Sequence, residues 1–250
     1  MNERSSEAIV LGSVDYGESD RIVTFLTRDR GRLSAFAAGA RKSKRRFAGV
    51  LEPFTRLEVR LQERRGELLF LASCSLHDGH AGLREDLGRI AHAGHAAELC
   101  RELCRDREPH EELFDLLAVY LRALCGEPAR PEDLLAFELA ALRHAGVSPR
   151  FTDCALCGAG ADGGALFDPA HGGIVCGACA GQAQPGSIRA DAQTLEAVRA
   201  LQAAGPFAGV AVDDPRTRRA ASGLVRSFTR EIVGKPLRSL DFLAQVGLEA

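Results

Sequence analysis

Four cysteines in the second half of the chain have the spacing of a metal site. They form two C-x-x-C pairs, Cys154 with Cys157 and Cys176 with Cys179, and eighteen residues separate the pairs. Two residues between paired cysteines let both sulfur atoms face one centre, and two such pairs complete a tetrahedron. The spacing therefore predicts one Zn²⁺ per chain. Four protein ligands leave no open coordination position, so the predicted zinc is structural and not catalytic.

A C-x-x-C pair can instead be a redox motif, but neither pair lies in the strand–helix–strand context of such motifs. Between the pairs, the apolar segments 166–169 and 172–175 predict a small hairpin of the zinc-ribbon type. A segment of this size has too small an apolar core to fold alone. We therefore expect the metal to supply much of its stability.

The second group of candidate residues is a run of positively charged side chains. Five of the six residues from 41 to 46 are cationic, and Gly39 and Gly49 flank the run and permit a turn or a mobile loop. A basic loop on a strand framework can follow a phosphate backbone without reading base sequence. Phe36 and Phe47 flank the loop and are candidates for stacking on bases. The alternatives are a solvated loop and two aromatic rings in a barrel core, which is the favoured position for Phe36.

Composition limits the class of protein more than the function. The 250 residues are 46% hydrophobic and 26% charged, with a net charge of −2, which is typical of globular proteins. The first 80 residues are basic, whereas residues 81–149 are acidic. The N-terminus has no signal pattern and no stretch is apolar enough to span a membrane, so we expect a cytoplasmic protein without a membrane partner. Eight cysteines in such a protein are not interpreted as disulfides.

The elements that must position these residues follow from hydrophobic periodicity. Short apolar or alternating runs bounded by turn residues predict five strands, at 8–11, 21–27, 33–37, 54–61 and 68–75. Five strands in about 80 residues favour an OB-fold over other small β-barrels.

Helical spacing of apolar residues follows, over 82–146 and again over 191–202 and 215–233, with a short closing element at 237–246. The fold class is therefore α+β and multidomain: an N-terminal OB-fold barrel, a central and C-terminal helical domain, and an inserted four-cysteine zinc ribbon. The expected boundaries are 1–80 for the barrel, 81–150 with 187–250 for the helical domain, and 151–186 for the ribbon.

Several residues of the helical region were weighed as sites. We expect Cys100, Cys104 and Cys125 to be small buried hydrophobes. His92 and His95, three residues apart, could be a metal pair, but without a third ligand an ordinary helix surface is favoured. The arginines within 215–233 could form a basic face, although solvated side chains are favoured.

Two patterns that resemble catalytic motifs do not fit their context. Residues 158–163 match G-x-G-x-x-G but follow a cysteine pair and not a strand, which excludes a dinucleotide site. His110 and Glu112 match half of a zinc deaminase motif, but no proline precedes the cysteine pair. No nucleotide-binding loop or nucleophile motif is found. We therefore expect no enzymatic activity.

With these pieces placed, the chain resembles the RecO family of bacterial recombination mediators over essentially its whole length. The most specific segments are 38–42 (AGARK) and 46–54 (RFAGVLEPF), together with 16–23 (YGESDRIV) near the N-terminus. Segment 138–149 precedes the first cysteine pair as it does in zinc-bearing members, and 224–240 resembles the family's C-terminal helix and tail.

The resemblance implies binding of single- and double-stranded DNA and annealing of complementary strands. It also implies that the protein, with RecR, helps RecA replace single-strand-binding protein, whose acidic C-terminal tail is a partner. No nucleotide and no catalytic residue are implied, and the expected location is the bacterial cytoplasm, at the nucleoid. The candidate DNA-binding residues are Arg21, Arg41, Lys42, Lys44, Arg45, Arg46 and Phe47.

Two other functions remain open from the sequence. One is a zinc-ribbon scaffold for protein assembly with incidental DNA contact. The other is a zinc hydrolase acting on nucleic acid, which four thiolate ligands argue against.

Overall fold

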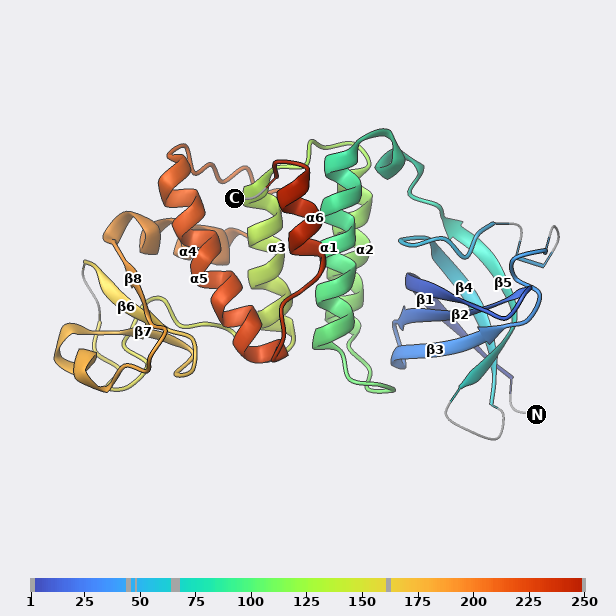
Figure 1. The fold of residues 1–250 in the computed structure, drawn as a ribbon, viewed down its shortest axis with the longest axis horizontal. Helices are drawn as coiled ribbons and strands as arrows, with labels where there is room; N and C mark the ends of the chain where they lie inside the picture. The colour runs from blue at the N-terminus through green and yellow to red at the C-terminus, as the bar shows by residue number, and fades with distance from the viewer. Residues whose placement is uncertain (1–2, 44–45, 48, 64–67, 161–162, 249–250) are drawn as a thin grey trace. The chain divides into compact units, whose positions relative to one another are not determined.

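The computed structural model describes residues 3–43, 46–47, 49–63, 68–160 and 163–248. The chain divides into two compact units, residues 1–128 and 129–250 (Figure 1). The first unit holds a β-barrel and two helices, and the second holds the remaining helices and a small three-stranded sheet. Among the described residues, no helix is both long and apolar enough to cross a membrane.

The barrel of the first unit has five strands in the closed order β1-β2-β3-β5-β4, which confirms the predicted OB-type barrel. The strands are β1 (Glu3–Tyr16), β2 (Asp20–Thr27), β3 (Gly31–Ala37), β4 (Arg56–Gln62) and β5 (Leu69–Asp78). β1 closes the barrel because it pairs with β2 along one edge and with β4 along the other. The predicted end of the first strand at Gly12 is wrong, because the register shifts between Val10 and Gly12 and pairing then continues to Tyr16.

Alternation along the strands fills the barrel. In β3 every second residue from Gly31 to Ala37 is buried, and the residues between them are partly exposed. Successive side chains of a strand point to opposite faces of the sheet, so one set forms the core and the other forms the outer face. The core members of β2 and β3 include Val23, Phe25, Leu33 and Ala35, each at most 2% exposed.

The seam between β3 and β5 is short, since within the described residues these parallel strands pair only at Ala35–Leu69 and Phe36–Phe70. Residues 106–107, which follow the first long helix, lie beside the N-terminal part of β3. Asp106 forms a parallel bridge with Arg32, and the Arg107 amide donates to the Arg32 carbonyl at 3.0 Å.

Two helices complete the first unit, α1 (Leu87–Leu103) and α2 (Glu111–Leu124), after a 3-10 helix, η1 (Ala81–Glu85). Arg28, at the end of β2, forms ion pairs with Glu111 at 2.8 Å and Asp115 at 2.9 Å. The predicted burial is confirmed for Cys100 and Cys104, whereas Cys125 is half-buried.

The histidine pair of α1 differs from the expectation of an ordinary helix surface. His92 and His95 are 0% and 1% exposed. His92 Nδ1 lies 3.2 Å from the Tyr120 hydroxyl of α2. Burial lowers the pKa of His92 to about 4, and the nearby His95 adds to this effect, so His92 is neutral at pH 7. Ala93, Ala96 and Ala97 of α1 are also buried, so the helix is enclosed on more than one side.

The second unit contains α3 (Pro131–His144), α4 (Ala192–Ala204), α5 (Pro215–Val233) and the short α6 (Ser239–Gln245). Its sheet has the order β7-β6-β8, from β6 (Ala165–Asp168), β7 (Gly173–Val175) and β8 (Ile188–Ala190). A further 3-10 helix, η2 (Gly177–Gln182), follows β7. β6 and β7 pair antiparallel, which confirms the predicted hairpin between the cysteine pairs.

Gly31 provides a test of the contact between the start of β3 and the segment that follows α1. Its φ is +65°, and an added Cβ would lie 1.8 Å from the Glu108 carbonyl oxygen. Gly31→Ala should lower the free energy of unfolding by more than the ~1–2 kcal/mol that a left-handed φ alone costs. The matched control is Gly39→Ala, which has a φ of +69° but no atom within 4 Å of the added Cβ. Equal losses for the two variants in urea unfolding would contradict the contact with Glu108.

Candidate metal centre and nucleic-acid interface

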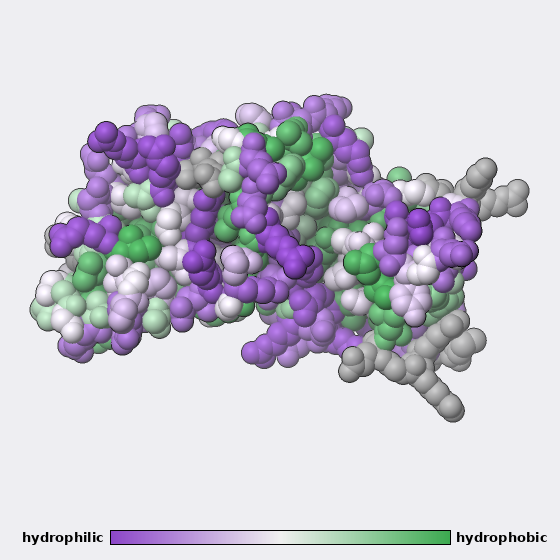
Figure 2. Space-filling model, in the orientation of Figure 1, coloured by the Kyte–Doolittle hydropathy of each residue, from purple (hydrophilic) through white to green (hydrophobic). Residues whose placement is uncertain are grey.

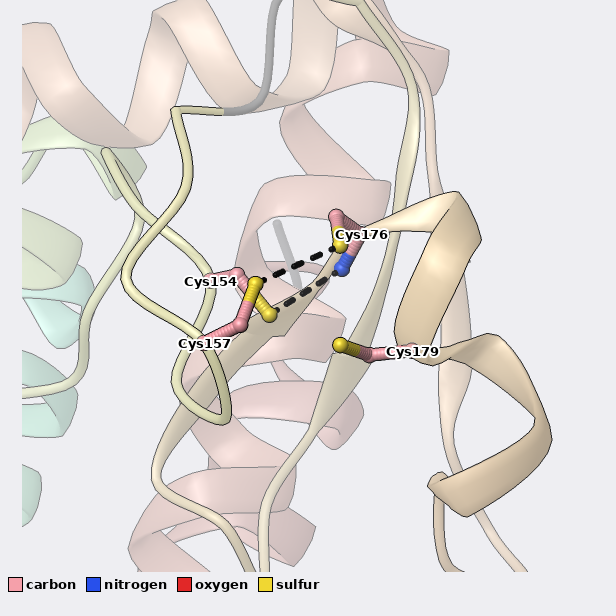
Figure 3. Close-up of side chains that lie close together, drawn as sticks. All are labelled: Cys154, Cys157, Cys176 and Cys179. Atoms are coloured by element: carbon pink, nitrogen blue, oxygen red, sulfur yellow. Dashed lines mark hydrogen bonds between the residues drawn. The ribbon is translucent and has the colours of Figure 1, made fainter.

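The four predicted cysteines come together in the second unit. Cys154 and Cys157 lie in the loop before β6, Cys176 follows β7, and Cys179 lies in η2. Their Sγ atoms are all within 4.8 Å of one another, and Figure 3 shows the side chains converging from the two segments. Among the described residues this is the only group of His, Cys, Asp or Glu side chains close enough to hold a metal ion.

Backbone hydrogen bonds shape the turns that aim the sulfurs. The Gly158 amide donates to the Cys154 carbonyl at 2.9 Å, and the Cys179 amide donates to the Cys176 carbonyl at 3.0 Å. Gly158 has a φ of +74°, which residues with a Cβ rarely adopt. The Ala155 amide also donates to the Ile174 carbonyl at 2.7 Å, which ties the first turn to β7.

Electrostatics around the sulfurs favour a bound cation. The Cys176 amide donates to Cys154 Sγ at 3.4 Å and is the main reason that the pKa of this thiol falls to about 6. Hydrogen bonds with Cys157 and Cys176, together with burial, raise the pKa of Cys179 to about 12. Four thiolates this close repel one another, and a cation at their centre removes that repulsion.

Packing excludes water from part of the centre. Cys154 is 0% exposed and Cys179 is 9% exposed, and both contact Val175, whereas Cys157 is on the surface. Four sulfur ligands in a closed group match the donor set of a structural metal site and leave no position for a reacting water.

Asp168 at the end of β6 holds the hairpin around the centre. Its side chain is 1% exposed and accepts from the amides of Ala170, His171 and Gln184 and from His171 Nδ1. Burial opposes ionisation, but the bonds from Gln184 and His171 outweigh it and lower the pKa of Asp168 below its ordinary value. A buried carboxylate with four donors is stable only while all of them stay in place.

Aromatic rings join this region to α5. Phe151 and Phe167 are stacked with their ring centroids 5.3 Å apart, and Phe167 meets Phe228 of α5 edge-on at 6.4 Å. The sequence analysis did not identify Asp168 or these three aromatic rings as supports of the metal centre, because their contacts involve segments that are distant in the chain.

The basic loop lies beside the turn between β1 and β2 in the first unit. The Arg41 amide donates to the Ser19 carbonyl, and Arg41 Nε lies 3.4 Å from Asp15. Lys42 is exposed. Lys44 and Arg45 lie outside the residues that the structure describes.

Three other predicted DNA-binding residues have clear positions. Arg21 forms ion pairs with Glu52 at 3.1 Å and Asp15 at 3.2 Å, and the hydrogen bond that it donates to Glu52 is the main cause of its raised pKa. Arg46 is exposed, donates to the Ala38 carbonyl and lies over the Phe47 ring at 4.4 Å. Phe47 is 1% exposed in the barrel core, so it cannot stack on a base without leaving the core.

Three aromatic residues of the barrel that are exposed or partly exposed lie on its outer face instead. Phe36 is only partly buried, contrary to its expected core position, because it lies between the inward-facing Ala35 and Ala37. Tyr16, 57% exposed, meets Phe36 edge-on at 5.8 Å, and Phe70 lies 6.5 Å from Phe36. The sequence analysis did not single out Tyr16 or Phe70, although period-two alternation could have placed both on the outer face.

Asp168→Asn tests the support of the metal centre. The amide side chain has one acceptor oxygen fewer and no charge, so we expect a loss of about 1–3 kcal/mol in the free energy of unfolding of the second unit. Reaction of the cysteines with a thiol reagent in the presence of a chelator should also be faster. The matched control is Asp213→Asn, an exposed carboxylate in the same unit. Equal reaction rates for the two variants would show that Asp168 does not hold the hairpin.

Two family models together match most of the chain. Residues 1–80 match the family described as Recombination protein O N terminal, and residues 84–241 match Recombination protein O C terminal. The chain is 51% identical to the DNA repair protein RecO of Myxococcus xanthus, over 100% of both chains. It is 49% identical to that of Anaeromyxobacter sp. (99% of this chain, 98% of the relative) and 37% identical to that of Geobacter sulfurreducens (98% and 99%). The chain therefore belongs to the RecO family of DNA repair proteins.

Proposed function

We propose that this protein is a non-enzymatic mediator of recombinational DNA repair that binds single- and double-stranded DNA and anneals complementary strands. Together with RecR it helps RecA to load on DNA that is covered by single-strand-binding protein. Membership of the RecO family supports the repair role. The finer activities rest on the surface chemistry of the barrel and on the resemblance of the chain to recombination mediators.

The observation that carries the DNA-binding part is the row of Tyr16, Phe36 and Phe70 on the outer face of the barrel. The face formed by strands 2 and 3 is where OB-folds bind oligonucleotides. Phe36 lies on β3 and is paired with Ile22 of the neighbouring strand β2. Solvent-accessible rings beside one another can stack on successive bases without selecting a sequence.

The basic loop supplies the second component of such a site. Arg41 donates to the carbonyls of Gly17 and Glu18, so its side chain lies over the turn that follows Tyr16. A strand whose bases stack on the row would bring its phosphates to Arg41 and Lys42. Neutralising phosphates there would also lower the repulsion between two complementary strands, so annealing would need no nucleotide.

For the metal centre we propose one structural zinc ion. Four sulfur donors in a closed tetrahedral group suit zinc, which would supply folding free energy to the hairpin of β6 and β7. The chain's own residues would then position the ribbon and take no part in a reaction.

DNA binding can be divided into its two components by a salt titration of a fluorescent single-stranded oligonucleotide. Replacing the five cations of residues 41–46 by glutamine should reduce the slope of log K against log salt by roughly 3.5, at about 0.7 per phosphate contact. Each of Tyr16→Leu and Phe36→Leu should instead weaken binding by ~1–3 kcal/mol, the typical contribution of one stacked base, with little change in slope.

The matched control for the aromatic variants is Phe242→Leu, because Phe242 of α6 is 38% exposed but lies outside the barrel. An unchanged slope in the loop variant, together with full affinity in both aromatic variants, would refute DNA binding at this face. Co-purification with RecR by a protein that has no DNA affinity would favour the assembly scaffold.

The zinc proposal predicts one ion per chain by elemental analysis. Cys176→Ser should abolish stoichiometric zinc and expose the region 151–186 to proteolysis, because a metal-held segment of this size has little core of its own. Cys125→Ser, a half-buried cysteine outside the cluster, should retain the ion. Retention of stoichiometric zinc by both variants would contradict the assignment of the ligands.

A further inference from the structure

A row of arginines lies along the exposed side of α5, in the unit that does not contain the barrel. The residues are Arg216, Arg219, Arg226 and Arg230. The spacings between successive members are three, seven and four residues. At 100° per residue these positions fall within about 80° of one another on the helix surface, and they extend over about 21 Å. Figure 2 shows hydrophilic residues gathered along α5 on the face drawn there.

The opposite side of α5 explains why these side chains point outward. Leu224, Val225 and Phe228 are at most 3% exposed and form the packed side of the helix. Arg216, Arg219 and Arg230 are exposed, and Arg226 is half-buried. Because the apolar side of α5 is packed, the arginines lie on its other side, and the rigid helix holds them in a line.

The guanidinium groups of this row form no ion pair in the described part of the chain, although the charge of Arg216 acts on the nearby Asp214. Of the five arginines of α5, only Arg218 has a carboxylate within 4 Å among the residues that the structure describes, and that partner is Glu132 at 3.1 Å. Arg226 Nε is shielded from solvent and has no hydrogen-bond acceptor in the described part of the chain. A shielded donor without an acceptor is unfavourable, so the Arg226 side chain would gain a hydrogen bond by turning outward to an external anion.

The arginines of the barrel behave differently. Arg21, Arg28 and Arg32 each have carboxylate partners at 2.6–3.2 Å. An external anion must displace these partners, whereas at the row on α5 it would only displace water. The acid within α5 is Glu231, whose helical angle is 60° or more from every member of the row.

We propose that this row on α5, which we call the α5 face, is a second binding surface for a DNA backbone. The small residues Ala220 and Gly223 are exposed between the arginines, and a Cβ added at Gly223 would meet nothing within 4 Å. The face thus lets a strand approach closely and offers no aromatic ring, so it contacts phosphates and not bases. An acidic peptide would need apolar anchors, which the surface between the arginines does not provide.

The proposal deepens the annealing function and rests on it. One strand would stack on the aromatic row of the barrel, and a second strand would lie on the α5 face. A single chain would then hold two strands with two different chemistries. The barrel surface selects unpaired bases, whereas the α5 face accepts any phosphate backbone, including that of a duplex.

The test is a bridging assay with the full-length chain. One unlabelled oligothymidine is immobilised, the protein is bound to it, and capture of a second, fluorescent oligothymidine is measured against salt. The two strands cannot pair, so capture reports a second site. The test variant replaces all four arginines of the α5 face by glutamine, which preserves helix propensity. Circular dichroism and thermal unfolding verify that it folds.

We expect the glutamine variant to bind the immobilised strand with unchanged affinity and to lose capture of the second strand. For the unaltered protein, the slope of log K for capture against log salt should be roughly −2.8, for four contacts at about 0.7 each. Replacing the same four arginines by lysine should retain capture, because backbone contact needs charge and not the shape of the guanidinium. A charge-matched control removes four exposed arginines elsewhere and should also retain it: Arg84, Arg105, Arg122 and Arg143.

The outcomes separate this inference from the proposed function. If the unaltered protein binds the first strand but captures no second strand, the α5 face is refuted and DNA binding by the barrel stands. Full capture by the glutamine variant, or equal loss in the charge-matched control, also refutes it. Competition by polyglutamate at the charge concentration of the oligonucleotide would assign the face to acidic peptides and overturn the DNA assignment. Absence of binding to any strand would overturn the proposed function itself.

Discussion

Closure of the barrel is the constraint on which the rest of the first unit depends. Because β1 pairs with both β2 and β4, every strand residue faces either the enclosed core or the outside. This alternation buries Ala35 and Ala37 and leaves Phe36 on the outer face beside Tyr16. The aromatic row proposed to bind bases is therefore a by-product of the same pairing that builds the core.

Ion pairs then divide the basic residues into those that stabilise the fold and those that are available to a ligand. Arg28 and Arg32 join the barrel to the helical part of its unit through Glu111, Asp115 and Asp106. The excess of acid in residues 81–149 is thus used in part to neutralise the barrel. Among the described residues, the cations without an ion pair include Lys42 and Arg46 of the loop and the arginines of the α5 face, whereas Arg41 of the loop lies 3.4 Å from Asp15.

In the second unit the hairpin of β6 and β7 lies next to the group of four sulfur atoms and has little core of its own. The hairpin is short, and the buried Asp168 and the stacking of Phe151 on Phe167 also hold it. Phe167 also contacts Phe228, on the packed side of α5. The same helix therefore supports the hairpin with one side and presents its arginines on the other.

The sequence by itself determined the four cysteines and their hairpin, the five strands and the family, because ligand spacing, period-two alternation and motif order are local. It also identified the loop cations, although Lys44 and Arg45 lie outside the described residues. Only the tertiary structure decided that Phe47 is in the core, that Phe36 joins Tyr16 and Phe70, and that His92 is buried and neutral. The physical reason is that burial and partner choice depend on segments far apart in the chain, which periodicity does not report.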